Sequence, residues 1–196
     1  MLRRKTNASL EPDIDRIEQN LILIEDRIQS MLSLSRELIL SRSKYELTGL
    51  QEALIELLAE ATFEAEANGK ALVYQDIPDV QLSLNVENFR SGIEHILRNA
   101  IHYTRSQIEV DFQVNQNKLC IKISDDGPGV KPEDLERLFE AFYRSENTEV
   151  EDSHGAGLGL AIAGHMIKSH HGTIKAENGQ ESGLIIILTL PIVKAL

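Results

Sequence analysis

The spacing of apolar residues changes near residue 43, and this change constrains the fold more than any other feature of the sequence. From Ile14 to Leu38, apolar side chains recur at alternating steps of three and four, the pattern of a helix that packs along a partner helix. Further along the chain, helical stretches mix with short runs in which apolar and polar residues alternate, as they do in strands. The chain therefore divides into a helical segment, residues 1–42, and a mixed segment, residues 43–196.

The helical segment has two possible partners. It could pack on the mixed segment, or it could belong to a helical bundle. We favour the bundle, because the apolar seam continues to Leu38 while glutamine, glutamate, aspartate and arginine fill the other faces.

The mixed segment predicts strands and helices in groups rather than in strict alternation. The predicted strands are residues 44–48, 71–75, 81–84, 107–114, 118–124, 173–177 and 184–190, and the predicted helices are residues 50–68, 86–103, 133–139 and 158–170. Grouped elements of this kind indicate an α+β fold, a two-layer sandwich, more than a doubly wound sheet.

The composition excludes several classes of function. Lys and Arg total 20 against 31 Asp and Glu, and the resulting charge of −11 argues against a nucleic-acid partner, because phosphate backbones need a basic face. Cys120 is the one cysteine, so an intramolecular disulfide cannot form. No apolar run approaches the roughly 20 residues of a membrane-spanning helix.

Three local motifs could carry chemistry, and the first is Asp125-Asp126-Gly127-Pro128-Gly129, directly after a predicted strand. Glycines let the backbone approach a ligand closely, and a carboxylate at a strand end can accept a hydrogen bond from an exocyclic amine. The same residues also suit an ordinary turn, so this motif alone leaves both interpretations open.

The second motif is the glycine-rich run Gly-Ala-Gly-Leu-Gly-Leu at residues 155–160, which opens a predicted helix. Glycines before a helix leave backbone N–H groups free for phosphate oxygens. It is not a P-loop, because no Lys-Ser/Thr pair follows. It is also a poor dinucleotide-binding motif, because a polar loop precedes it where that motif needs a strand.

The third motif lies on the predicted helix at residues 86–103. His95 and Asn99 are four residues apart and share one helix face, and His102 follows three residues later. An imidazole and an amide oxygen can flank a hydrated Mg²⁺ that already carries phosphates. The alternative is a polar surface stripe on a packed helix.

In order and spacing, the three motifs together resemble the ATP-binding domain of sensor histidine kinases, within a superfamily that includes a chaperone and a mismatch-repair protein. The resemblance covers about residues 44–196. Asn99-Ala100 resembles the N box, residues 125–129 the G1 box, Phe139–Arg144 the F box and residues 155–160 the G2 box. Residues 108–110, 125–130 and 132–134 look most like the CpxA-type envelope-stress kinases, and residues 31–36 look like the second helix of the dimerisation and phosphotransfer domain.

The resemblance implies a role for each matching position. Asp125 would accept from the adenine amine of ATP, Tyr103 would flank the base, and Asn99 would bind Mg²⁺ with His95 nearby. Arg144 would reach the terminal phosphate, so Asn99, Arg144 and His95 form the implied catalytic set. The other implied nucleotide contacts are His102, Gly127, Gly129, Val130, Gly155, Gly157, Leu158, Gly159 and Leu160, and residues 130–156 would form a mobile lid.

Four positions depart from the family pattern. Two are tolerable: Ala141 replaces a frequent proline in the F box, and Ala156 replaces a frequent threonine in the G2 box, where the backbone carries the contact. His95 stands where many members carry asparagine, which leaves its role open between metal neighbour and phosphate contact. His102 stands where lysine or arginine is frequent, so phosphate binding should be weaker and sensitive to pH.

The resemblance also implies what the whole protein does. The family phosphorylates a histidine in a His-Glu-Leu-Arg-x-Pro context, and none of the six histidines of this chain has that context. We therefore expect a kinase piece whose phosphoacceptor and membrane segments lie outside the chain. The implied setting is the cytoplasmic portion of a bacterial inner-membrane sensor, a homodimer through its bundle, with a response regulator as partner. The alternatives are a nucleotide-regulated partner-binding module, or a stand-alone ATPase or serine kinase of the same superfamily.

Overall fold

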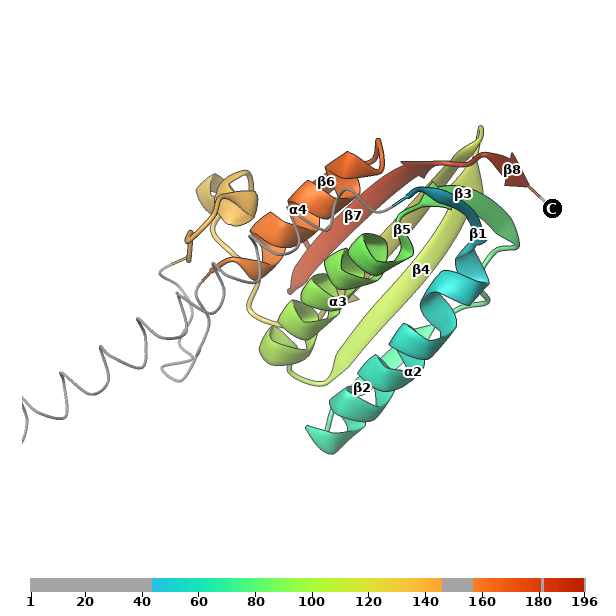
Figure 1. Ribbon diagram of the computed structural model, residues 1–196. Coiled ribbons are helices and arrows are strands. Elements are labelled where there is room, and N and C mark those ends of the chain that lie inside the picture. Colours follow the sequence, from blue (N-terminus) through green and yellow to red (C-terminus); the bar gives the residue numbers. More distant parts are fainter. Residues whose placement is uncertain (1–43, 146–156, 181, 196) are drawn as a thin grey trace, which may run out of the picture.

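The computed structural model describes residues 44–145, 157–180 and 182–195 (Figure 1). The predicted bundle helix, residues 1–42, lies outside the described residues, so the helix and the domain boundary stay predictions. In chain order the elements are β1 (Glu46–Gly49), α2 (Leu50–Ala67), β2 (Ala71–Tyr74), β3 (Val80–Leu84), α3 (Val86–Tyr103), β4 (Gln107–Asn115), β5 (Lys118–Asp125), η1 (Pro132–Asp134), η2 (Arg137–Phe139), α4 (Gly159–Ser169), β6 (Thr173–Asn178), β7 (Leu184–Pro191) and β8 (Lys194–Ala195).

The strands form two sheets. The larger has the order β2-β4-β5-β7-β6 and the smaller the order β1-β3-β8. β2 pairs with β4 in parallel, and the other neighbouring strands pair antiparallel. Helices α2, α3 and α4 lie over one face of the larger sheet (Figure 1), which confirms the predicted α+β two-layer architecture.

Burial follows the alternation that predicted the strands. On β5, Leu119, Ile121 and Ile123 are buried, while Cys120 and Lys122 between them are partly exposed. The buried side chains meet the apolar faces of the helices, including Phe89 of α3, which is completely buried. Since burial of each large aliphatic side chain is worth about 1.5–3 kcal/mol, this shared layer stabilises the fold and fixes the register of β5.

The predicted helix at residues 133–139 is wrong in type. The structure has two single-turn 3₁₀ helices there, η1 and η2. So short a segment gains too few hydrogen bonds to hold an α-helix by itself. Hydrogen bonds that the Asp134 carboxylate accepts from the hydroxyls of Tyr143 and Ser145 anchor the segment instead.

In the described part of the chain, no helix is both long and apolar enough to cross a bilayer.

A buried histidine joins the start of α3 to the end of α4. The Nε2 atom of His170 lies 3.1 Å from the backbone nitrogen of Asn85, and its Nδ1 atom lies 2.7 Å from the carbonyl oxygen of Met166. These distances fit a ring that accepts from the Asn85 N–H and donates to Met166. Only 3% of His170 is exposed, and its ring packs against Phe89 with 5.8 Å between centroids.

Replacing His170 with alanine should lower the free energy of unfolding by about 2–4 kcal/mol, because the buried Asn85 N–H loses its acceptor and a cavity opens beside Phe89. Urea denaturation measures the change. His165→Ala is the matched control, since His165 lies exposed on the same helix and should cost less than about 0.5 kcal/mol. Equal denaturation midpoints for the two variants would contradict the role given to His170.

Candidate functional site

The fold brings the three sequence motifs to one place. Residues 125–129 begin at the last residue of β5, residues 157–160 open α4, and α3 contacts both. A Cβ atom on Gly127 would lie 2.5 Å from the carbonyl oxygen of Tyr103, and one on Gly159 would lie 3.6 Å from Nδ1 of His95. The side chains that the sequence separates by about sixty positions therefore line one site.

Asp125, the last residue of β5, presents one carboxylate oxygen without a partner. Its Oδ1 atom accepts from the backbone N–H groups of Gly127 at 2.8 Å and Leu184 at 3.2 Å. Its Oδ2 atom accepts no hydrogen bond from the described residues. Burial raises the pKa of Asp125, and the two backbone hydrogen bonds offset that rise only in part. An oxygen placed in this way can accept from an amine of a ligand.

The neighbouring carboxylate, Asp126, has the opposite environment. Its Oδ1 atom accepts from the Thr104 hydroxyl at 2.5 Å, from the backbone N–H of Arg105 at 2.7 Å and from that of Ser106 at 3.0 Å. Its Oδ2 atom accepts from the Ser106 hydroxyl at 2.5 Å. These bonds outweigh desolvation and hold the pKa of Asp126 well below its ordinary value. Asp126 thus ties the end of β5 to the loop between α3 and β4.

Asp126→Asn should lower the free energy of unfolding at neutral pH by about 1–2 kcal/mol, the lower part of the range for charged hydrogen bonds, because solvent screens this partly exposed group. A depressed folded pKa stabilises the protein above the unfolded value of about 3.9, and that stabilisation is lost as the pH falls. The difference between wild type and variant should therefore shrink below about pH 4. Urea denaturation at several pH values measures it, and a difference that persists at acid pH would contradict the assignment.

The turn after Asp125 depends on close backbone approach. Gly127 packs so tightly on the Tyr103 carbonyl that no side chain would fit. Further along, Asn178 at the end of β6 holds Val130: its Oδ1 accepts from the Val130 N–H at 3.0 Å and its Nδ2 donates to the Val130 carbonyl at 2.7 Å. Gly129 lies against the same asparagine, since a Cβ atom there would be 2.8 Å from Asn178 Oδ1. The sequence analysis missed Asn178, because nothing in the local pattern links it to residue 130.

The face of α3 that carries His95 and Asn99 is turned toward the start of α4. His95 is half-buried against Gly159, and Asn99 is half-buried one turn further along. The Asn99 amide makes no hydrogen bond within the described residues. Among those residues no group of three or more His, Cys, Asp or Glu side chains could hold a metal ion. A metal bound beside Asn99 would therefore draw most of its ligands from elsewhere, as Mg²⁺ does from phosphates and water.

The C-terminal end of α3 gathers positive charge. The Nζ atom of Lys70 donates to the carbonyl oxygens of Ile101 at 2.5 Å and His102 at 3.3 Å. Burial lowers the pKa of His102, and the positive charges of Lys70 and Arg144 lower it further. The His102 ring stands edge-on to that of Tyr103, with 4.6 Å between centroids. Arg144 and His102 thus lie in one neighbourhood, and Lys70 is an addition from outside the motifs.

The start of α4 is shaped by Gly157 and Leu158. Gly157 has a φ of +70°, and a Cβ atom there would meet the Tyr143 carbonyl oxygen at 2.9 Å, so the position needs glycine. The Leu158 side chain is buried with Ile162 and Met166, so this residue can offer a ligand only its backbone. The first N–H groups of the helix lack intrahelical acceptors and carry its positive dipole end. Leu160 follows, partly exposed, while Gly155 lies outside the described residues.

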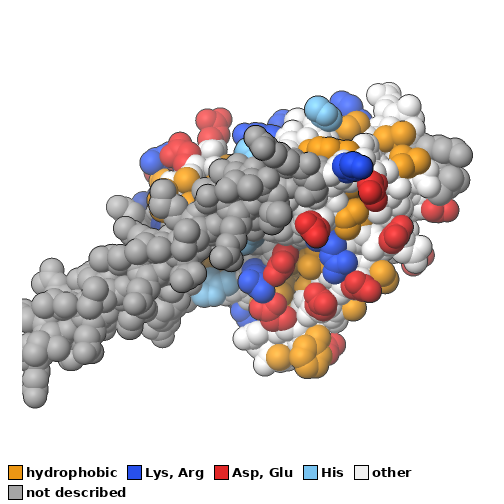
Figure 2. All heavy atoms as spheres, in the orientation of Figure 1, with side chains coloured by type: hydrophobic (Ala, Val, Ile, Leu, Met, Phe, Trp, Pro, Cys, Tyr) orange, Lys and Arg blue, Asp and Glu red, His pale blue; other side chains and the backbone are white. Residues whose placement is uncertain are grey.

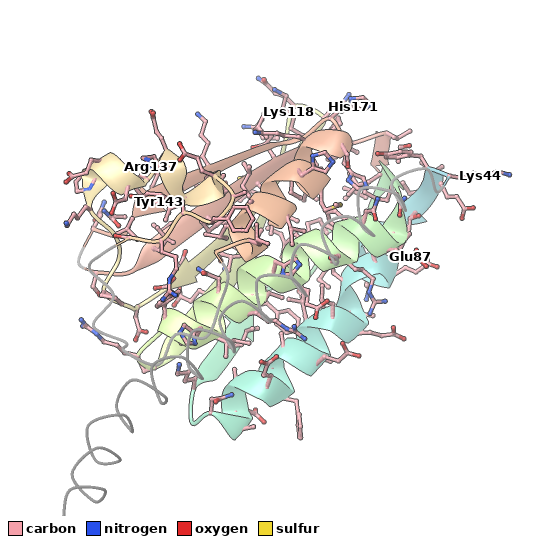
Figure 3. All side chains as sticks on the ribbon, turned by 60° about the vertical axis from the view of Figure 1, so that its left-hand side comes forward. Lys44, Glu87, Lys118, Arg137, Tyr143 and His171 are labelled. Atoms are coloured by element: carbon pink, nitrogen blue, oxygen red, sulfur yellow. The ribbon has the colours of Figure 1, made fainter. Side chains whose placement is uncertain are left out.

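The first part of the predicted lid has a defined structure. Arg137 lies over the ring of Tyr143, 4.0 Å from its centroid, and Figure 3 shows both at the opposite end of the domain from Lys118 and His171. The hydrogen bond to Asp134 raises the pKa of Tyr143, and the hydroxyls of Ser145 and Tyr143 lower the pKa of Asp134. Residues 130–145 are thus packed onto the domain, and residues 146–156 of the predicted lid lie outside the described residues.

Comparisons with known proteins identify relatives of this chain. The family model for histidine kinase-, DNA gyrase B-, and HSP90-like ATPases matches residues 85–194. The sensor histidine kinase CpxA of Escherichia coli K12 is 37% identical over 195 residues, which are 99% of this chain and 42% of CpxA. The chain thus spans less than half the length of that relative.

Solved structures share the fold. The mycobacterial sensor histidine kinase MprB has a TM-score of 0.66 at 22% identity over 75% of this chain and 98% of its own. Full-length ShkA in complex with AMPPNP has a TM-score of 0.68 at 18% identity over 94% of this chain and 39% of its own. The resemblance inferred from the motifs is confirmed: the chain belongs to the histidine kinase-, DNA gyrase B- and HSP90-like ATPase family, and its mixed segment is an ATPase domain of the sensor histidine kinase type.

Proposed function

We propose that this chain is the ATP-binding catalytic part of a two-component sensor histidine kinase. It would transfer the γ-phosphoryl group of ATP to a histidine outside this chain, and thence to a response regulator. The observation that carries the proposal is the partly buried Asp125 carboxylate, one oxygen of which has no partner among the described residues, on the same site as the Asn99 face of α3 and the start of α4.

At the adenine end, Asp125 Oδ2 would accept from the exocyclic amine of the base. The adenine ring would lie against the backbone at Gly127 and Gly129, with Tyr103 and Val130 beside it. A carboxylate acceptor selects adenine over guanine, because guanine presents a carbonyl oxygen at the corresponding position. Asp126 would take no part in binding, since both of its oxygens are already used.

At the phosphate end, the residues fit Mg²⁺. The Asn99 amide makes no hydrogen bond within the described residues, and an amide oxygen is a ligand that Mg²⁺ accepts. Asn99 would hold the ion, with His95 beside it, and the ion would neutralise charge on the phosphates. The backbone N–H groups of Gly157–Leu160 would bind phosphate oxygens, and Gly155 would belong to the same loop.

The acidic residues around the site make the metal and the helix dipole important for binding phosphates. Residues 125–152 hold ten acidic and three basic residues, so their net charge repels a polyphosphate. Arg144 would reach the terminal phosphate and orient it toward the nucleophile. The chain supplies orientation and charge neutralisation, and the attacking imidazole comes from the phosphoacceptor histidine.

The proposed setting follows from the relatives, which are sensor kinases. We place the chain in the cytoplasmic portion of an inner-membrane sensor, as a homodimer through a helical bundle that includes residues 1–42. Its partner would be a response regulator, and membrane contact would come from segments outside the chain.

A two-component assay tests the proposal. The chain is mixed with labelled Mg-ATP and a separate polypeptide that carries a histidine in the His-Glu-Leu-Arg-x-Pro context. We expect acid-labile, base-stable phosphate on that histidine, and none when the histidine is replaced by glutamine. Binding of ATP without transfer to any such polypeptide would instead favour a nucleotide-regulated binding module.

His102 should make ATP binding depend on pH. Its lowered pKa favours the neutral imidazole at neutral pH, and protonation at acid pH would add a cation near the phosphates. His102→Lys should raise ATP affinity at pH 7.5 by about 2- to 10-fold and flatten the acid dependence, on the scale of an exposed ion pair. Calorimetric titration at several pH values measures this. His102→Gln, which is neutral throughout, separates the effect from titration of ATP itself, and a wild-type profile equal to that of His102→Gln would refute it.

A further inference from the structure

A second surface, made of residues outside the three motifs, combines apolar and acidic side chains. A groove of about 440 Å³ lies between α2 and β2, lined by Ala59, Thr62, Phe63 and Glu66 of α2 and by residues 72–74 of β2. We call it the β2 groove. Phe63 is 75% exposed, Val73 48% and Tyr74 37%, and Ile55 on the same helix is 41% exposed. Three of the exposed large apolar side chains of the described residues, Phe63, Val73 and Tyr74, therefore line one groove, which is typical of an interaction site.

The groove runs beside an open sheet edge. β2 is the first strand of the larger sheet and, among the described residues, pairs only with β4. The N–H groups of Ala71 and Gln75 donate to Ser106 and Val110 on the β4 side. Backbone groups alternate direction along a strand, so those of Leu72 and Tyr74 point to the open edge. An extended segment can add there as a further strand.

The charge of α2 indicates which residues an extended segment added to β2 would carry. Helix α2 carries five glutamates, Glu52, Glu56, Glu60, Glu64 and Glu66, and no lysine, arginine or histidine. Within the described part of the chain, Glu56 is the one glutamate of α2 with an ion pair, to Arg90 at 3.2 Å. Figure 2 shows red and orange side chains side by side over α2, down to the end of the molecule where α2 finishes. A second copy of this chain would bring the same acidic helix against itself, which like-charge repulsion disfavours.

We propose that the β2 groove docks an extended segment of a partner protein, which adds to the free edge of β2 as a strand. The segment places a large apolar side chain beside Phe63, with lysine or arginine on the same face to meet the α2 glutamates. Successive side chains of a strand point to opposite faces, so the anchor and its basic neighbours stand two positions apart. This interaction is independent of the nucleotide site.

The test uses two capped peptides, Thr-Lys-Thr-Phe-Thr-Lys-Thr and its counterpart with glutamate in place of lysine. Each is titrated into the ¹⁵N-labelled protein to about 1 mM, the range of weak peptide contacts. We expect the lysine peptide to shift amide resonances of residues 59–66 and 71–75 and to slow hydrogen exchange at Leu72 and Tyr74. The glutamate peptide should bind at least about tenfold more weakly at low salt, and added salt should narrow the difference.

Two variants distinguish peptide binding in the β2 groove from nonspecific hydrophobic binding elsewhere on the protein. Phe63→Ser should weaken binding of the lysine peptide by about fivefold or more, since its side chain is the most exposed contact. The fold does not depend on it, and the unfolding midpoint checks this. Val114→Ser removes another exposed apolar side chain, 45% exposed, from β4 and should leave binding unchanged. Equal binding of both peptides, shifts outside the groove, or unchanged exchange at Leu72 and Tyr74 would overturn the proposal. So would sedimentation showing that Phe63→Ser abolishes self-association, because a second copy would then occupy the groove.

Discussion

Asp125→Asn should cost roughly 1.5–3 kcal/mol of ATP binding, a weakening of about 10- to 150-fold. The asparagine oxygen can still accept from the N–H groups of Gly127 and Leu184, as Oδ1 does now. The change is therefore confined to Oδ2, where an acceptor becomes an NH₂ donor that faces the amine of the base. Calorimetric titration with Mg-ATP measures the loss, and Mg-GTP should bind poorly to the wild type. Equal affinities of the wild type for ATP and GTP would contradict the adenine assignment.

The same variant should keep or gain stability, which separates a binding role from a structural one. Burial raises the pKa of Asp125 above that of the unfolded chain. For a raised carboxyl pKa, the ionised form costs stability above that pKa, and the cost disappears as the pH falls below the unfolded value. Asparagine carries no charge and removes the cost at neutral pH. Lower stability of the nucleotide-free Asp125→Asn protein would show that the carboxylate is needed for folding.

The two adjacent aspartates show what the sequence can and cannot reveal about the site. Both follow the same strand, and the residue types alone do not say which one is free to bind. The motif resemblance selected Asp125, and the structure shows Asp126 fully engaged with Thr104, Arg105 and Ser106. That difference depends on the meeting of β5 with the α3–β4 loop, a contact between positions about twenty residues apart. The local sequence pattern does not predict this contact.

Helix α3 was predictable because its signals are local. The predicted bounds, residues 86–103, agree with the structure. Asn85 accepts from the Asn88 N–H at 3.2 Å as an N-cap, and apolar residues repeat at helical spacing along the buried face. The hairpin of β4 and β5 was equally clear, because its strands alternate on both sides of a short polar turn.

Pairing between distant strands was not predictable in the same way. Strands were expected at residues 71–75 and 81–84, yet β2 joins the larger sheet and β3 the smaller. Each depends on a partner far along the chain, β4 for β2 and both β1 and β8 for β3. β8 was missed altogether, since two residues are too few for a periodic signal. The buried bridge made by His170 was missed for the same reason, because its partner Asn85 is remote in sequence.

Asn99→Ala should remove most of the Mg²⁺-dependent part of ATP binding and of phosphoryl transfer. We expect a loss of roughly 2–4 kcal/mol, the scale for deleting one group that stabilises developing charge. The Asn99 amide makes no hydrogen bond within the described residues, so its removal should change the free energy of unfolding little. Adenosine binding should stay nearly intact, because Asn99 faces the phosphates and not the base.

The experiment compares Mg-ATP, ATP with chelator and adenosine by calorimetry for wild type, Asn99→Ala and Arg98→Ala. Arg98 is the matched control: it precedes Asn99 on α3 but is exposed and pairs with Glu94 at 2.8 Å. If the metal is held at Asn99, only Asn99→Ala loses the difference in affinity between Mg-ATP and metal-free ATP. If Asn99→Ala binds Mg-ATP as the wild type does, the face of α3 that carries His95 and Asn99 is not the metal side of the site. The phosphates would then depend on the start of α4 and on Arg144, whose backbone and guanidinium donors need no metal to bind an anion.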